Sequence, residues 1–239
     1  MIVEVGHYAL VLALALSLVL SVAPVVGARR RDPALMDVAR PAAFMQFALI
    51  AFSFGALTYA HVVSDFSVVN VIENSHSMKP MIYKISGVWG NHEGSMLLWV
   101  LILASFGAAL AIWPRMMPRD LRALTIAVQS WVAVAFLSFI LFTSNPFARA
   151  RMAPIEGNDL NPILQDPGLA IHPPLLYLGY VGFSIAFSFA AAALINGRID
   201  AAWARFIRPW VLIAWVFLTL GIAMGSYWAY YTLGWGGFW

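Results

Sequence analysis

The stretch from Val5 to Ala28 reads VGHYALVLALALSLVLSVAPVVGA and carries no Asp, Glu, Lys or Arg. A helix needs about 20 mostly apolar residues to cross a lipid bilayer, and this stretch is long enough. Glu4 precedes it, and three arginines, Arg29 to Arg31, follow it. A secretory signal peptide has its basic residues before the apolar run. We therefore expect a transmembrane helix that is retained, with its N-terminus outside.

Five further uncharged stretches follow along the chain: Pro41–Ser64, Gly94–Pro114, Ala123–Ala148, Pro167–Gly197 and Pro209–Trp239. Each is long enough to span a bilayer. We expect the fifth helix to begin near Pro173-Pro174, because proline is tolerated in a first turn, and the sixth to end near Tyr231. The sequence predicts an all-α polytopic membrane protein with about six transmembrane helices.

The composition supports the same fold class. Hydrophobic residues make up 62% of the 239 residues and charged residues only 10%, whereas a soluble domain is about half apolar and a quarter charged. This excludes a water-soluble enzyme and a disordered chain. Cysteine is absent, so the chain forms no disulfide, no thiolate metal site and no thiol relay.

The basic residues indicate the orientation in the membrane. Most of the 14 Lys and Arg residues lie in the short segments after the first, third and fifth spans. Positively charged loops stay on the cytoplasmic side, so we expect both chain ends and the two longer loops to face outward. The net charge of +3 fits this role of the arginines and does not indicate nucleic-acid binding.

The first outer loop, Asp65–Glu93, carries apolar residues at helical spacing after Pro80. They are Met81, Ile82, Ile85, Val88 and Trp89. This spacing predicts a short amphipathic helix on the membrane surface. His92 and Glu93 follow at the start of the third span. A carboxylate is favourable at a helix N-terminus, and we prefer that explanation to a ligand role.

The second outer loop, Ser144–Pro173, is rich in proline and asparagine, which favour turns and a fixed irregular path. It ends in Ile171-His172-Pro173-Pro174. A residue before proline is pushed toward extended geometry, so we expect His172 in a restricted backbone at the mouth of the fifth span. From position alone, a polar residue at the membrane rim is the commoner explanation of such a histidine.

The C-terminal segment is crowded with aromatic residues. An aromatic belt at the membrane interface explains Tyr227 to Tyr231. It does not explain Trp235-Gly236-Gly237-Phe238-Trp239, because a belt needs no closely set glycines. Glycines let a flat ligand approach the backbone, and tryptophans offer planar faces for stacking. This pattern favours a flat aromatic ligand on the outer surface.

Three segments together resemble the haem-handling membrane proteins of cytochrome c maturation, in particular their CcmF branch. Trp89–Ser95, WGNHEGS, resembles the family motif WGGHEGS, with Asn91 in place of the second glycine. Asp159–Pro174, DLNPILQDPGLAIHPP, resembles the family block DLNPLLQDPGLAIHPP. Trp235–Trp239 resembles the opening of the tryptophan-rich WWD motif. The resemblance covers essentially the whole chain, most strongly from Trp89 onward.

The resemblance implies part of a cytochrome c haem lyase, which holds haem on the outer face while it is joined to the CxxCH segment of apocytochrome c. His172 matches the first outward-facing haem histidine of the family and would be the axial ligand of the iron. Trp235, Gly236, Gly237 and Trp239 would bind the haem. Arg149 or Arg151 could pair with a propionate, although solvation of loop charges explains both better. No catalytic residue is identified.

The family also implies a setting. Haem b would be both the substrate and a bound group, and the partners would be apocytochrome c, a CcmH-type apocytochrome chaperone and a CcmE-type haem chaperone. The membrane would be the bacterial inner membrane, with the functional face periplasmic; an organellar membrane is the alternative. We expect two parts: residues 1–88, with two transmembrane helices and an outer loop, and residues 89–239, the haem-handling core.

The WWD motif stops at Trp239, before its usual Trp-Asp continuation. The second outward histidine and the intramembrane haem histidines of the family have no counterparts, and His7 and His61 should not inherit those roles. We expect a fragment or one part of a split protein, active as an enzyme only when the missing C-terminal part completes it.

Two other classes of function stay open from the residues. The first is a membrane transporter or proton-channel subunit, and the second is a non-catalytic membrane scaffold. Transporters and channels generally place ionisable groups inside the membrane. The six stretches contain no Asp, Glu, Lys or Arg, and their obvious polar candidates are His7, His61, Gln46 and Gln129. Proton pumping is therefore disfavoured.

Overall fold

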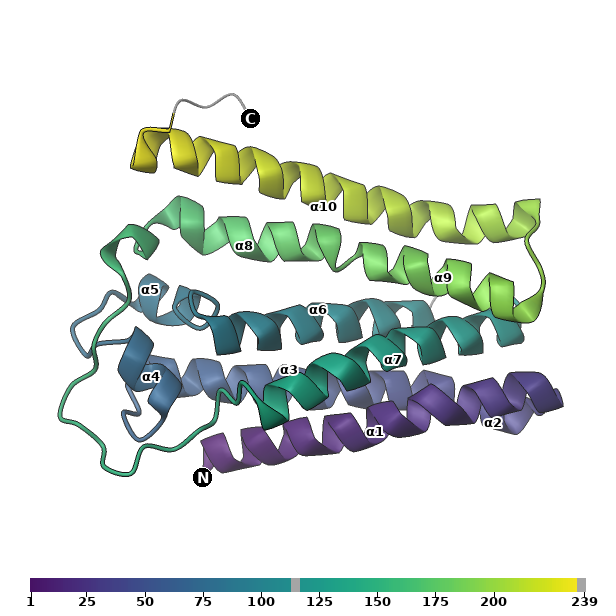
Figure 1. Cartoon of the computed structure of the whole chain (residues 1–239), viewed down its shortest axis with the longest axis horizontal. Coiled ribbons are helices and arrows are strands. Elements are labelled where there is room, and N and C mark those ends of the chain that lie inside the picture. The colour runs from purple at the N-terminus through teal and green to yellow at the C-terminus, as the bar shows by residue number, and fades with distance from the viewer. Residues whose placement is uncertain (113–116, 236–239) are drawn as a thin grey trace.

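The structure, a computed structural model, describes residues 1–112 and 117–235. Within these ranges, six helical segments are long and apolar enough to cross a membrane, and they lie side by side as a bundle (Figure 1). They are α1 (Ile2–Arg30), α2 with α3 (Pro33–Asp37 and Ala39–Val62), α6 (His92–Ile112), α7 (Arg119–Phe142), α8 with α9 (Pro167–Tyr180 and Phe183–Asn196) and α10 (Ala201–Leu233). The predicted all-α fold with six spans is confirmed.

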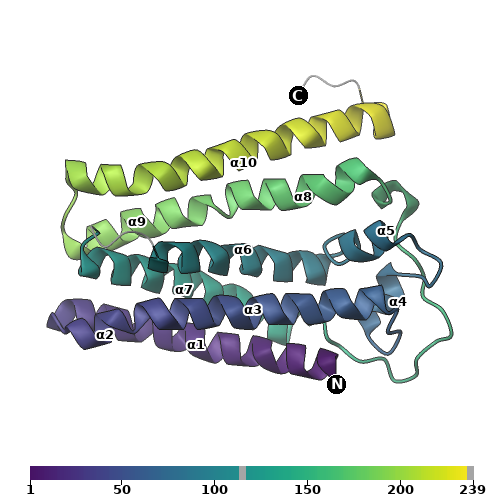
Figure 2. The same ribbon diagram turned by 180° about the vertical axis from the view of Figure 1, so that it is seen from behind.

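The helices are stacked so that α10 forms one edge of the bundle, beside the α8–α9 pair (Figures 1 and 2). On the far side of that pair, α6 and α7 pack against α3 and α1. Leu10, Ile50, Leu103 and Leu137 are fully buried between them. By contrast, α10 exposes large apolar side chains, as expected of a surface that faces lipid: Leu212, Trp215, Val216, Leu220 and Ile222.

One expected helix start was wrong. The fifth span begins at Pro167, well before Pro173-Pro174. The Asp166 side chain accepts hydrogen bonds from the backbone N–H groups of Gly168 and Leu169, which is the geometry of an N-terminal cap. Pro167 then takes the first helical position, where its missing N–H costs nothing. The sixth span ends at Leu233, close to the expected Tyr231, with Gly234 left-handed at φ 66°.

The two long loops gather at one end of the bundle, together with the N-terminus and the C-terminal end of α10 (Figure 1). They contain α4 (Val69–Asn74), α5 (Met81–Ser86) and the 3₁₀ helix η1 (Pro162–Leu164). The helix α5 follows Pro80 and is the short helix that the apolar spacing predicted. The opposite end holds α2 and the shorter connections (Figure 2).

Backbone hydrogen bonds join the two long loops. Val69 N–H donates to the Ala148 carbonyl at 2.9 Å, and Asn158 N–H donates to the Ile72 carbonyl at 2.7 Å. An ion pair of 3.4 Å between Lys79 and Asp159 lies beside them. Burial lowers the pKa of Lys79, and the Asp159 carboxylate opposes that shift. These contacts give the proline-rich loop a fixed path over the first loop.

The orientation in the membrane can be tested with fusion reporters. The end of α1 and the loop that contains Asn158 lie at opposite ends of the bundle (Figure 1). We expect a phosphatase fused after Asn158 to be active and one fused after Arg30 to be inactive, because the arginine-rich side faces the cytoplasm. A fusion after Gly197 should behave like the Arg30 fusion. If the fusions after Arg30 and Asn158 are both active or both inactive, the predicted topology is contradicted.

Candidate functional site

His172 lies inside α8 and does not have the extended backbone that was expected before Pro173. That expectation was wrong because the cap at Asp166 starts the helix before the chain reaches the prolines. Both prolines are therefore interior residues of α8. The side chain of His172 is half-buried, on the side of α8 that contacts α10.

The imidazole of His172 is held by the backbone of α10. Its Nδ1 lies 2.8 Å from the carbonyl oxygen of Gly221. Because a carbonyl oxygen only accepts, Nδ1 must carry the hydrogen, and in the neutral ring Nε2 then carries the lone pair. A backbone acceptor on one ring nitrogen is the usual way in which proteins orient a metal-ligating histidine.

Three glycines allow α8 and α10 to approach this closely. A Cβ atom on Gly225 would lie 2.5 Å from Cε1 of His172, so the imidazole occupies the space where a side chain would begin. A Cβ on Gly221 would lie 2.7 Å from Cα of Leu176, and one on Gly179 would lie 2.4 Å from Cα of Leu218. Small residues are the means by which membrane helices reach backbone contact.

The outer ends of the same two helices are also tied together. Asp166, which caps α8, accepts a hydrogen bond from the Tyr231 hydroxyl on α10. Trp228, also on α10, packs its Cβ close to Gly168. Its indole Nε1 is buried without a partner among the described residues. The first turn of α8 and the last turns of α10 therefore form one unit.

The predicted tryptophan site is placed only in part. Trp235 follows the end of α10 and is 60% exposed, with a free aromatic surface. Gly236, Gly237 and Trp239 lie outside the described residues. His172 contacts α10 at Gly221 and Gly225, and the helical rise of 1.5 Å per residue puts Gly225 about 12 Å from the end of α10 at Leu233. The histidine is thus deeper in the bundle than a rim residue.

A hydrogen bond that the sequence did not predict joins the segment Trp89–Ser95 to the segment Asp159–Pro174. The carbonyl of Ala170 would normally accept from the N–H of residue 174, which proline lacks. Instead the indole Nε1 of Trp89 donates to Ala170 at 3.1 Å. A cavity of about 290 Å³ lies beside this bond, and its lining includes Trp89, His92, Leu164, Leu169 and Pro173. The proline pair was the sequence signal that could have predicted this contact, because two prolines inside a helix leave two carbonyls without their usual backbone donors.

The Trp89–Ser95 segment forms the N-terminus of α6, as expected for His92 and Glu93. Asn91, which replaces a family glycine, has a structural task here. Its Oδ1 accepts from the Gly94 N–H at 2.9 Å, and its Nδ2 donates to the Gly87 carbonyl at 2.8 Å. His92 is exposed at the edge of the cavity.

His61, His7 and Arg149 have partners of their own. Nε2 of His61 pairs with Asn70 at 2.9 Å, and His7 pairs with Asn145 at 3.1 Å. Arg149 forms ion pairs with Glu4 and with Asp65. The expected explanation for Arg149 was solvation of a loop charge, whereas its guanidinium is paired with two carboxylates; a propionate partner stays a prediction.

Comparison with known proteins gives consistent matches. The family model described as "Cytochrome C assembly protein" matches residues 89–239. The cytochrome c-type biogenesis protein CycK of Rhizobium meliloti is 69% identical over all 239 residues, and CcmF of Escherichia coli is 53% identical over 240 positions. A solved structure named cytochrome c haem lyase CcmF superposes with a TM-score of 0.88 at 30% identity, over 100% of this chain. The chain spans 35%, 37% and 38% of those three proteins, respectively.

Proposed function

The chain belongs to the family of cytochrome c assembly proteins, and from that premise we propose that it is part of a cytochrome c haem lyase. In this proposal the complete protein holds haem on the outer membrane face while it is joined to the CxxCH segment of apocytochrome c. The similarity of the whole chain to CycK and CcmF supports this assignment. The alternative of a transporter or channel subunit finds no such support.

The observation that carries the proposal is the hydrogen bond from Nδ1 of His172 to the Gly221 carbonyl at 2.8 Å. It leaves the lone pair on Nε2, which is the form of imidazole that ligates haem iron. The contact with Gly225 fixes the ring against α10. A histidine at a membrane rim would need neither the backbone acceptor nor the glycine beneath it.

Haem is the substrate here, and it supplies the iron and the vinyl groups that react with the cysteine thiols. The residues of this chain bind and orient it. His172 would hold the iron from α8, and Trp235 would offer a stacking face at the end of α10. Gly236, Gly237 and Trp239 would extend that face. The absence of cysteine from the chain means that no thiol of its own competes with those of apocytochrome c.

We also propose the finer setting that the family suggests. The haem would be haem b, and the partners would be a CcmH-type apocytochrome chaperone and a CcmE-type haem chaperone. The membrane would be the bacterial inner membrane, with the periplasmic face functional. The clustering of both long loops with the end of α10 supports a single functional face (Figure 1).

The polar side chains inside the helices favour a rigid scaffold over a transport path. Gln46 on α3 donates to Ser17 on α1 at 2.6 Å. Gln129 on α7 donates to Ser184 at 2.8 Å and accepts from Ser188 at 2.7 Å, both on α9. These bonds tie neighbouring helices together and use up the polar groups that a proton path would need.

Depletion of the complete protein from cells tests the proposed function. We expect covalent haem in c-type cytochromes to disappear on haem-stained gels, while the absorption of b-type cytochromes persists, because only the attachment step is lost. Export of the apocytochrome, followed by immunoblot, is the control. Normal staining of c-type cytochromes after depletion would contradict a haem lyase role.

A further inference from the structure

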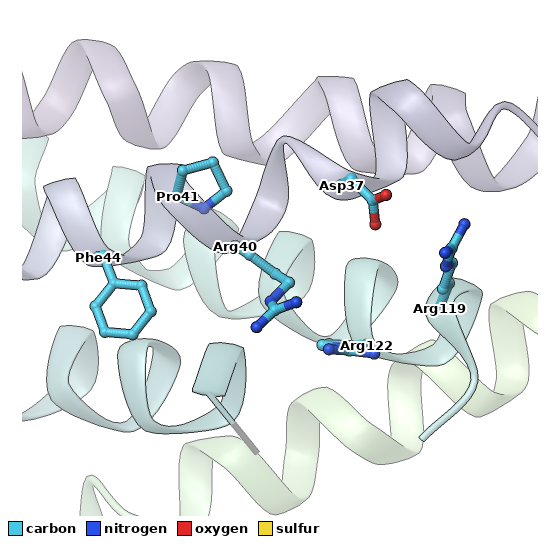
Figure 3. A pocket seen from close by; sticks show the side chains of 6 residues that line it. All are labelled: Asp37, Arg40, Pro41, Phe44, Arg119 and Arg122. Carbon is cyan, nitrogen blue, oxygen red and sulfur yellow. The ribbon is translucent and has the colours of Figure 1, made fainter. Parts of the chain in front are cut away.

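A second pocket lies among α2, α3 and α7, at the end of the bundle opposite the long loops (Figures 1 and 3). Its volume is about 630 Å³. The described residues that line it are Asp37, Arg40, Pro41, Phe44, Arg119 and Arg122. The proposed haem chemistry uses none of them, so the pocket needs an explanation of its own.

The pocket concentrates positive charge. Three guanidinium groups and a single carboxylate, that of Asp37, face it. The ion pairs found among the described residues include none of the three arginines. Figure 3 shows the side chains of Arg40 and Arg122 at the same pocket, Arg40 from α3 and Arg122 from α7. Like charges held in one pocket repel one another, and an anion between them would remove that repulsion.

Arg122 is a buried arginine with an unsatisfied donor, which indicates that the pocket is a binding site. Its side chain is buried, with the residue only 7% exposed. Nη2 donates to the Met117 carbonyl at 3.3 Å, whereas Nη1 is buried without a partner among the described residues. A buried charged donor with no acceptor is strongly unfavourable. An anionic oxygen in the pocket would supply the missing acceptor.

Arg40 is positioned for the same ligand. Its Nε donates to the Ala111 carbonyl at the end of α6, with a distance of 3.0 Å. That bond anchors the side chain and leaves the two terminal amino groups of the guanidinium free to bind an anion in a fork geometry. Guanidinium groups bind phosphate oxygens in this way, with two parallel hydrogen bonds.

The surroundings of the pocket identify the source of the anion. Phe44, which lines the pocket, is 39% exposed, and Ile112 at the end of α6 is 63% exposed. Both belong to helices that are apolar enough to span the membrane, so their exposed faces meet acyl chains. We propose that this pocket binds an anionic phospholipid, with its phosphate between Arg40 and Arg122. Basic pockets between transmembrane helices are known to bind such headgroups.

Native mass spectrometry of the purified chain from mixed phosphatidylcholine and phosphatidylglycerol micelles tests this site. We expect one phosphatidylglycerol to be retained in preference to phosphatidylcholine. Arg40→Gln and Arg122→Gln should each weaken its retention roughly tenfold, as the loss of one charge-assisted pair predicts. Arg205→Gln, which changes an exposed arginine of α10 that does not line the pocket, should leave retention unchanged.

Three outcomes would overturn the proposal. The first is equal retention of the two lipids, and the second is unchanged retention of phosphatidylglycerol in both pocket variants. The third comes from thermal unfolding: if inorganic phosphate alone raises the unfolding temperature as much as phosphatidylglycerol does, the ligand is a free anion. Circular dichroism checks that each variant is folded. If Arg122→Gln fails to fold, Arg119→Gln replaces it, because that side chain is exposed at the pocket and does not belong to the core.

Discussion

His172→Ala is expected to abolish covalent haem attachment in the complete assembly while the membrane protein stays folded. The substitution removes the imidazole that would ligate the iron. Its cost in stability is small, because the half-buried ring makes one hydrogen bond, to the Gly221 carbonyl, and such a bond contributes about 1 kcal/mol. Haem-stained gels measure attachment, and immunoblots of the membrane fraction measure the amount of protein.

Two matched variants sharpen this result. His172→Gly should be partly rescued by added imidazole, which refills an open axial position; a structural role of the side chain would not respond in this way. Trp235→Ala should weaken haem retention less sharply, because neighbouring aromatic residues share the stacking. If His172→Ala matures cytochrome c normally, the ligand assignment fails and the histidine is only a polar side chain between two helices.

Gly179→Ala is expected to destabilise the protein by about 1–3 kcal/mol, the usual cost of overpacking. The added Cβ would lie 2.4 Å from the backbone of Leu218, so α8 and α10 would have to separate. Separation would also draw His172 away from Gly221, and haem attachment should fall with stability. Thermal unfolding of the purified protein, followed by circular dichroism, gives the change in stability.

Gly107→Ala is the matched control for this experiment. It lies inside α6, and its added Cβ would meet no atom nearer than 4.0 Å. Alanine is favoured over glycine inside a helix by about 1 kcal/mol, so this variant should be as stable as the parent or more so. Equal stability of the two variants would show that the contact between α8 and α10 is softer than the structure indicates.

The sequence was sufficient for the features that depend on local composition. Six apolar stretches predicted six spans, and the spacing after Pro80 predicted α5, because both signals lie within a few turns of chain. The start of α8 was missed, although Asp166 followed by Pro167 is a cap signature that outweighs the later proline pair.

The setting of His172 depends on contacts between distant residues. No local pattern predicts that its ring meets Gly221, which lies 49 positions further along the chain. A weaker signal was present in Gly221 and Gly225, which are four residues apart on an apolar helix and mark a face for close packing. The roles of Gly236, Gly237 and Trp239 stay predictions.

The proline pair has a mechanical consequence. A helix without two successive backbone donors bends more easily than an intact one, so the stretch of α8 from Leu169 to Pro174, which contains His172, is easier to bend than the rest of the helix. Two hydrogen bonds from outside the helix hold this stretch in place. The indole of Trp89 donates to the Ala170 carbonyl, and the imidazole of His172 donates to the Gly221 carbonyl. The position of the proposed haem ligand would therefore depend on Trp89 and Gly221, two residues for which no contact with haem is proposed.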